Sequence, residues 1–265
     1  MPDPVPVIVV RDLRVAYGAK VAVENVSFTV NAGEILGYLG PNGAGNSSTV
    51  KVLCGMNAPT AGSVTVCGFD VAKDPLEVKR RLGYVPESGA LYESLTVEEH
   101  LLLLGRLYHL ADAEILRRGR EYAGFLGLEE KWTERVGALS KGTRQKVLIA
   151  AALLHNPEVL FFDEPLSGLD VNAALLFREL VRSLAASGKA IFYSSHVLEV
   201  VEQLCQRVII LDRGRVVADG PVAQLRERAH EASLNAVFQK LTSQGDVAAA
   251  ARAFAAAVTA SSPSP

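Results

Sequence analysis

A glycine-rich turn between an apolar strand and a helix constrains the fold more than any other feature of this sequence. Residues 34–39 form a short apolar run, residues 40–48 read Gly-Pro-Asn-Gly-Ala-Gly-Asn-Ser-Ser, and residues 47–53 have a composition suited to a helix. Such a turn gathers successive backbone N–H groups and a helix N-terminus around one point, and its glycines permit close approach. The spacing therefore predicts a loop that binds phosphate oxygens.

The position after the last glycine of this loop is Asn46, where a phosphate loop has a lysine. Losing a charge-assisted hydrogen bond to phosphate costs about 1.5–3 kcal/mol. Ser47, whose hydroxyl suits Mg²⁺, is in place. Because a glycine-rich turn without the lysine is also compatible with a plain strand-to-helix connection, the prediction depends on partners elsewhere in the chain.

Two adjacent carboxylates supply one such partner. Residues 159–162 form an apolar strand that ends in Asp163 and Glu164. We expect Asp163 to hold Mg²⁺ and Glu164 to polarise an attacking water. The alternative for an acidic pair at this place is a helix cap.

Composition and charge exclude several functions. The chain has 265 residues with a formal net charge of −2, so it lacks the basic surface that draws proteins to nucleic acid, and we expect no nucleic-acid partner. Its three cysteines are widely separated and fit core thiols in a reducing compartment. The N-terminal residues lack the succession of a signal peptide. The longest apolar run, residues 147–154, falls short of the ~20 residues of a spanning helix, so we expect another chain to cross any membrane involved.

The hydrophobic pattern predicts an α/β fold with an insertion. Residues 7–17 and 21–30 alternate as antiparallel strands do, and apolar strands at 159–162, 190–193 and 208–211 alternate with helical stretches such as 171–186, which indicates a mostly parallel sheet. Residues 88–154 contain helical segments at 96–109 and 113–126 and predict an inserted helical subdomain. Leu234, Val237, Phe238 and Leu241 mark a last amphipathic helix, followed by an alanine-rich tail over residues 243–265.

The segment that begins at Leu139 gives the most specific family signal. Its residues are Leu139, Ser140, Lys141, Gly142, Thr143, Arg144 and Gln145, and they resemble the signature motif of the ABC ATPase family. The motif departs from the usual pattern at Lys141, where glycine is more common, and at Thr143, where glutamine is. The resemblance covers residues 7–242. It implies that Ser140, Gly142 and Gln145 face the ATP held by an opposite subunit, while Ser140 also caps the following helix.

The same resemblance assigns roles to the remaining residues. The phosphate loop comprises Gly40, Pro41, Asn42, Gly43, Ala44, Gly45, Asn46, Ser47 and Ser48. Tyr17 would stack on adenine, although a tyrosine there is otherwise a packing residue. Glu87 stands where a glutamine usually senses Mg²⁺ and the membrane partner. Residues 166–170 would communicate across the dimer, and His196 would contact the γ-phosphate, where a lone histidine is otherwise structural.

The family fold implied is a P-loop NTPase core with a mostly parallel sheet, an antiparallel β-layer and the helical subdomain, in one nucleotide-binding domain over residues 1–242. The resemblance implies an ATP-binding subunit at the cytoplasmic face of a membrane, with ATP and Mg²⁺ as cofactors. Its expected partners are a second ATP-binding subunit and a transmembrane subunit docked near residues 87–91. Asp163 lies only 117 positions after Asn46, which leaves no room for the long coiled coil of chromosome-maintenance relatives. The signature variant, Glu87 and residues 234–242 favour export.

Three alternatives stay open. Asn46 is either natural or a change introduced to trap a state, and the presence of Glu164 and His196 favours the second. The chain could also be a regulatory module that uses nucleotide only to dimerise. A soluble ABC ATPase that acts on nucleic acid or a protein machine is the third, and the neutral charge disfavours it.

Overall fold

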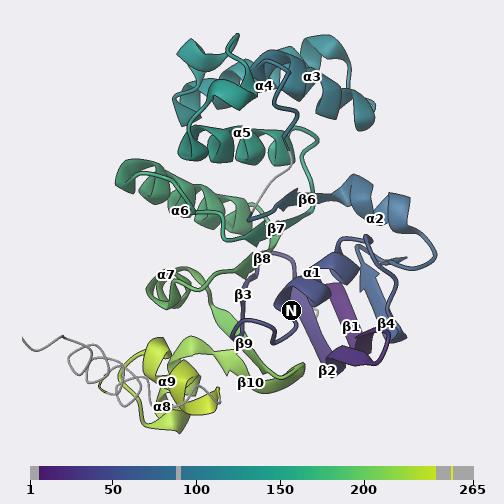
Figure 1. The fold of residues 1–265 in the computed structure, drawn as a ribbon, viewed down its shortest axis with the longest axis vertical. Helices are drawn as coiled ribbons and strands as arrows, with labels where there is room; N and C mark the ends of the chain where they lie inside the picture. The colour runs from purple at the N-terminus through teal and green to yellow at the C-terminus, as the bar shows by residue number, and fades with distance from the viewer. Residues whose placement is uncertain (1–5, 88–90, 243–251, 253–265) are drawn as a thin grey trace, which may run out of the picture.

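Two β-sheets form the centre of the computed structural model, which describes residues 6–87, 91–242 and 252 (Figure 1). Within this described part, the smaller sheet has four antiparallel strands in the order β2-β1-β4-β5. They are β1 (Pro6–Tyr17), β2 (Lys20–Asn31), β4 (Ala61–Val66) and β5 (Phe69–Asp70). The expected antiparallel layer is therefore confirmed, and it has two strands more than the alternation predicted.

The larger sheet carries the site. Among the described residues it has six strands, in the order β10-β9-β3-β8-β7-β6, and all pairs are parallel except β10 with β9. The strands are β3 (Ile35–Leu39), β6 (Leu82–Val85), β7 (Val159–Asp163), β8 (Ala190–Ser194), β9 (Arg207–Asp212) and β10 (Arg215–Pro221). Because parallel strands end at the same edge, the segments after β3, β7 and β8 meet there.

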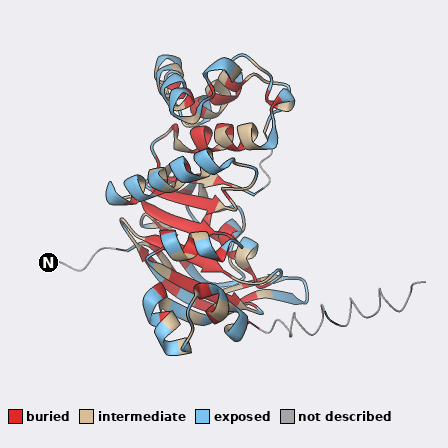
Figure 2. Cartoon of the chain, turned by 90° about the vertical axis from the view of Figure 1, so that its left-hand side faces the viewer, coloured by how far each residue is buried: buried red, intermediate tan, exposed pale blue. Residues whose placement is uncertain are grey.

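The central strands read as continuous apolar runs because both faces of the larger sheet are covered (Figure 2). The side chains of neighbouring residues in one strand point to opposite faces of the sheet. Phe161 packs with Phe192 and Tyr38 in the hydrophobic cluster shared with the antiparallel sheet and helix α1 (Asn46–Leu53). Phe162 packs edge-on against Phe177 in the cluster on the other face.

Helices cover that other face. They are α6 (Val171–Ala186), α7 (Leu198–Leu204), α8 (Val222–Ala229) and α9 (Leu234–Leu241). The expected last amphipathic helix is confirmed as α9, because Leu234 and Val237 are fully buried in this cluster. The short helix α2 (Pro75–Arg81) leads into β6. Except for Arg252, the alanine-rich tail at 243–265 lies outside the described residues.

Three helices at the top of Figure 1 have a hydrophobic cluster of their own. They are α3 (Val97–Leu107), α4 (Asp112–Leu126) and α5 (Lys141–Leu153), joined by the short 3-10 helices η1 (Glu129–Lys131) and η2 (Val136–Ala138). Trp132 anchors the cluster and donates to Glu98 Oε2 at 2.5 Å. Thr96 and Glu99 form a capping box at the start of α3, as its sequence favours. Helical segments were expected here, and they are confirmed.

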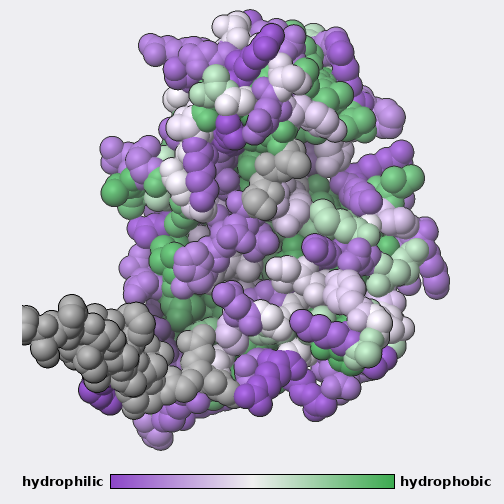
Figure 3. All heavy atoms as spheres, in the orientation of Figure 1, coloured by the Kyte–Doolittle hydropathy of each residue, from purple (hydrophilic) through white to green (hydrophobic). Residues whose placement is uncertain are grey.

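Hydrophilic residues cover much of the face in Figure 3, and hydrophobic ones appear as separate patches. Among the described residues, none of the helices has the length and hydropathy needed to span a bilayer.

Candidate nucleotide site

The turn after β3 has the backbone of a phosphate cradle. Gly43 and Gly45 have φ values of 83° and 112°, in the left-handed region that favours glycine. A Cβ on Gly45 would lie 2.6 Å from the Ala22 carbonyl oxygen, and one on Gly40 would lie 2.9 Å from that of Leu211. Close packing therefore excludes a side chain at Gly40 and Gly45, and backbone N–H groups can face a ligand there.

Helix α1 starts in this loop without a side-chain cap. Its first N–H groups lack intrahelical partners, and together with the helix dipole they favour an anion at this end. Thr49 supports the loop from beneath: its hydroxyl bonds the Gly45 carbonyl at 3.1 Å and the buried Tyr38 hydroxyl at 3.1 Å. The residues present thus fit a phosphate chain.

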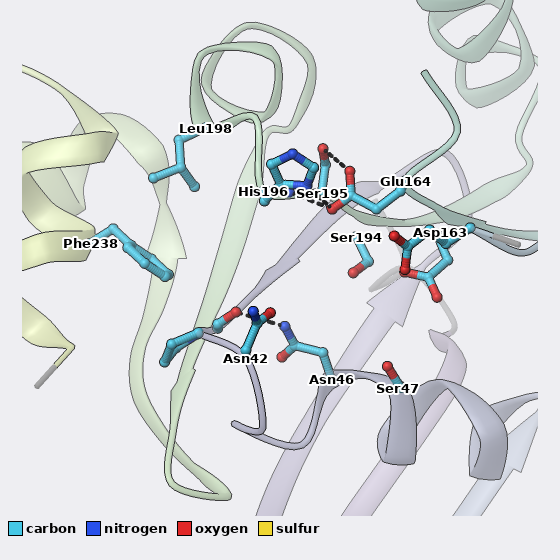
Figure 4. A pocket seen from close by; sticks show the side chains of 13 residues that line it. Asn42, Asn46, Ser47, Asp163, Glu164, Ser194, Ser195, His196, Leu198 and Phe238 are labelled. Carbon is cyan, nitrogen blue, oxygen red and sulfur yellow. Dashed lines mark hydrogen bonds and ion pairs between the residues drawn. The ribbon is translucent and has the colours of Figure 1, made fainter. Parts of the chain in front are cut away.

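A pocket of about 710 Å³ lies between this loop and the ends of β7 and β8 (Figure 4). The structure brings together nine of the residues expected from the sequence: Gly40, Pro41, Asn42, Asn46, Ser47, Glu87, Asp163, Glu164 and His196. They come from four separate parts of the chain. Their convergence on one pocket follows from the parallel order of β3, β8 and β7.

Carboxylates line the side of the pocket opposite the loop. Burial raises the pKa of Asp163, the nearby Glu164 and Glu87 raise it further, and a hydrogen bond from Ser194 opposes the shift. A half-buried carboxylate that is repelled by its neighbours gains from a bound cation. Asp163 with the Ser47 hydroxyl thus offers oxygen ligands of the kind that Mg²⁺ prefers.

Glu164 is held in a specific position at the strand end. Its φ of 48° is in the left-handed region, which is uncommon for a non-glycine residue, and its N–H donates to the Ser194 carbonyl at 2.9 Å. Oε2 accepts from the Ser195 hydroxyl at 3.0 Å, and Oε1 accepts from the His196 N–H at 2.6 Å. Only 15% of the Glu164 side chain is exposed, against 81% for His196. The carboxylate is therefore oriented before any ligand arrives.

Asn46 folds back into the loop. Its Nδ2 donates to the Gly40 carbonyl at 3.1 Å, while Oδ1 is buried and has no hydrogen-bond partner among the described residues. The side chain therefore brings an unpaired acceptor to the place where a lysine would bring a cation. The described residues that line the pocket include three carboxylates and no lysine or arginine.

Tyr17 lies in a shallower recess along the same loop, which also involves Gly43, Gly45 and Ser48. The residue is 48% exposed, and its hydroxyl accepts from the Asn57 side-chain amide at 3.2 Å. An exposed aromatic beside the loop can stack on a base. Ala44, by contrast, is buried in the core below.

The signature residues do not line the pocket of their own chain. Ser140 is exposed and caps α5 by accepting from the Thr143 N–H at 3.2 Å. Gly142 lies against the loop after β7, where an added Cβ would be 2.3 Å from the Gly168 carbonyl oxygen. Gln145 is buried, and its Nε2 donates to the Pro165 carbonyl at 3.1 Å, so its amide supports this loop rather than facing outward.

The structure adds pocket residues that the sequence reasoning did not select. Ser195 orients Glu164, Leu198 and Phe238 form an apolar wall, and Lys20 lies in the recess beside Tyr17. Of these residues, only Ser195 could have been selected from the sequence, because it directly precedes His196. Phe238 carries no such signal, because its place on the apolar side of α9 fits packing equally well.

A glycine cradle at a helix N-terminus, facing two acidic residues at the end of another parallel strand of the same sheet, defines a P-loop nucleotide-binding protein. The sequence profile described as "ABC transporter" matches residues 23–167. The chain belongs to the ABC transporter family, as an ATP-binding subunit, and the expected family is confirmed.

Named relatives agree with this assignment. The chain is 40% identical to "ABC transporter ATP-binding protein NatA" of Bacillus subtilis (strain 168), over 84% of this chain and 92% of that protein. It is 37% identical to "Linearmycin resistance ATP-binding protein LnrL" of the same organism, over 82% and 70% of the two chains. It is 39% identical to "Nod factor export ATP-binding protein I" of Ralstonia nicotianae, over 83% and 68%.

Solved structures show the same fold. The "Structure of ATP binding subunit of ABC transporter" superposes with a TM-score of 0.84 at 36% identity, covering 89% of this chain and 99% of that one. The "Dimeric Structure of MJ0796, a Bacterial ABC Transporter Cassette" gives a TM-score of 0.75 at 25% identity, covering 81% and 98%. The expected ABC ATPase fold is therefore confirmed.

Proposed function

We propose that this chain binds ATP with Mg²⁺ and couples its binding and hydrolysis to transport, in the direction of export, through a transmembrane subunit. The observation that carries the proposal is the single pocket in which the phosphate loop faces Asp163, Glu164 and His196. Export is favoured because relatives of similar identity are named for resistance and for Nod factor export. The proposed domain spans residues 1–242, with the helical subdomain over 88–154 and the tail over 243–265.

Each part of the pocket has its own task. The backbone N–H groups of the loop and α1 hold the phosphates, and Tyr17 holds the base. Ser47 and Asp163 hold Mg²⁺, with Glu87 beside them. The cation, when bound, offsets charge on the phosphate oxygens. Glu164 orients the attacking water and accepts its proton, and His196 reaches the terminal phosphate from the exposed end of the pocket.

Asn46 weakens this machinery. The amide is neutral and its Nδ2 is engaged with the Gly40 carbonyl, so it does not supply the charge-assisted hydrogen bond that a lysine makes to phosphate oxygens. Charge grows on those oxygens in the transition state, so hydrolysis suffers more than binding. We expect nucleotide to bind through the remaining contacts and to turn over slowly.

A second subunit completes the site in this proposal. Ser140 and Gly142 lie outside the pocket of their own chain, which suits residues that face a ligand on a partner. A similar cassette, MJ0796, has a dimeric structure, and this likeness supports a pair of subunits. The transmembrane subunit would dock near residues 87–91, which places this chain peripherally at the cytoplasmic face.

The test compares the assembled transporter with its Asn46→Lys and Asn46→Gln variants. Asn46→Lys should raise the ATPase rate by about ten- to a hundredfold, because it restores a charge-assisted bond of ~1.5–3 kcal/mol. Asn46→Gln controls for side-chain length and should leave the rate unchanged. Equal rates for all three would show that position 46 does not limit turnover.

The Asn46→Lys result also separates the alternative function. A regulatory module that uses nucleotide only to dimerise would bind ATP without hydrolysing it even after the lysine is restored. The absence of a lysine or arginine from the described pocket lining is the observation that favours this alternative.

A further inference from the structure

Two distant segments are joined between the proposed docking site and the signature motif. The Gly137 N–H donates to the Glu93 carbonyl at 2.9 Å, and the Val136 N–H donates to the Leu95 carbonyl at 2.8 Å. The Val97 N–H donates to the carbonyl of Glu134 at 3.1 Å. Residues 93–97 follow the docking segment 87–91, and residues 134–137 lead into Ser140. These backbone hydrogen bonds hold the two segments side by side.

Arg144 fastens this pairing to helix α5. Its Nε lies 3.1 Å from the carbonyl oxygens of both Val136 and Leu139, and Nη2 donates to the Gly137 carbonyl at 2.6 Å. Nη1 donates to Glu93 Oε1 at 2.9 Å. One guanidinium in the first turn of α5 therefore holds three carbonyls of the segment before Ser140 and a carboxylate of the segment after the docking site.

The geometry needs the fork of an arginine. The acceptors are three backbone carbonyls at η2 and one carboxylate, and they lie in several directions. A planar guanidinium with five N–H donors can bond all of them, and a lysine ammonium cannot. The Glu93 side chain is 65% exposed, so its ion pair contributes little by itself. The bonds to the backbone carbonyls carry the restraint.

Arg144 is not among the residues that line the nucleotide pocket. Its Nε bonds the carbonyl of Leu139, the residue directly before Ser140, so Arg144 can act on nucleotide chemistry through the position of Ser140. We propose that Arg144 is a positioning residue that locks Ser140 and the start of α5 to residues 93–97. This inference rests on the proposed two-subunit function.

The test uses the Asn46→Lys chain as parent, so that nucleotide is held firmly. Arg144→Met removes the fork, Arg144→Lys keeps the charge, and Glu93→Gln removes only the carboxylate. Arg118→Met is the matched control, because Arg118 also bonds a carboxylate, Glu114 at 2.6 Å, and a carbonyl, Leu154 at 2.6 Å, but at the other end of α5.

Two measurements separate positioning from folding: affinity of the dilute monomer for a fluorescent ATP analogue, and dimerisation with a non-hydrolysable ATP analogue by sedimentation. Arg144→Met should leave monomer affinity within about threefold and weaken dimerisation by about tenfold or more, the equivalent of one lost charged hydrogen bond. Arg144→Lys should fall between, Glu93→Gln should show a smaller loss, and Arg118→Met should dimerise normally.

The contrary outcomes are distinct. Normal dimerisation of Arg144→Met, or the same loss in Arg118→Met, overturns the inference. If Arg144→Met does not fold, the dimerisation of Arg144→Lys provides the test: a loss relative to the parent supports the inference, and normal dimerisation overturns it. If the Asn46→Lys parent binds nucleotide but does not dimerise, the two-subunit proposal falls, and the role of Arg144 falls with it.

Discussion

Glu164 and His196 are joined twice in this structure: Oε1 accepts the backbone N–H of His196 at 2.6 Å and lies 2.8 Å from its Nδ1. The two residues follow β7 and β8, which are neighbours in the sheet. The left-handed φ of Glu164 turns its side chain toward the next strand end. Oε2 accepts only from the Ser195 hydroxyl, so the carboxylate keeps acceptor capacity for a water without giving up either contact with His196.

Glu164→Gln should separate binding from hydrolysis. Glutamine keeps the shape but cannot accept a proton, so in the Asn46→Lys chain we expect hydrolysis to fall by about a hundredfold or more, with nucleotide affinity little changed. A phosphate-release assay and equilibrium binding measure the two. Glu199→Gln, on the exposed side of α7, is the control. Retention of more than a tenth of the rate would remove Glu164 from the base role.

Gly142→Ala should damage the junction between α5 and the loop after β7. The new Cβ would sit 2.3 Å from the Gly168 carbonyl oxygen, so one backbone must move, at a cost of about 1–3 kcal/mol. Gly124→Ala in α4 is the control: its nearest neighbour would be 3.6 Å away, and alanine should stabilise the helix by about 0.5–1 kcal/mol. Urea unfolding measures both, and equal stabilities would contradict the packing argument.

Asp163→Asn should stabilise the protein without Mg²⁺ at neutral pH. Burial and two carboxylates raise the pKa of Asp163, so its ionised form opposes folding. That penalty is present above the raised pKa and disappears as pH falls below the unfolded value of about 4. Thermal unfolding should show a higher midpoint for Asp163→Asn at pH 7 and equal midpoints near pH 3. A lower midpoint at pH 7 would show that burial of this carboxylate costs nothing.

His155 should make the junction between α5 and β6 sensitive to acid. Its ring stacks on Tyr108 with centroids 3.7 Å apart, Nε2 bonds the Leu82 carbonyl at 2.9 Å, and burial lowers its pKa to about 4. Protonation then favours the unfolded chain, so stability falls between pH 6.5 and 4, by at most about 3 kcal/mol. His155→Phe should flatten the unfolding free energy over this range by that amount, and an unchanged slope would contradict the assignment. Buried His100 contributes in both proteins and cancels in the difference.

Strong periodicity and turn chemistry made much of the fold predictable. The alternation in β1 and β2, the apolar runs of β3, β7, β8 and β9, and the capping serine of α5 are local properties, and each was found where expected. Strand β4, helix α2 and strands β6 and β10 were not predicted. For the three strands, pairing of β4 with β1, of β6 with β7 and of β10 with β9 decides the structure.

The sequence by itself determined the phosphate loop, the acidic pair, the signature and the family, because each depends on residue types at fixed short spacings. Only the tertiary structure decided that Asn46 leaves a buried, unpaired oxygen in the loop. It also decided that Gln145 faces inward to Pro165 and that Arg144 holds the segment before Ser140. These contacts join residues from separate elements or depend on a side-chain rotamer, and local sequence pattern encodes neither the distance between elements nor the direction in which a side chain points.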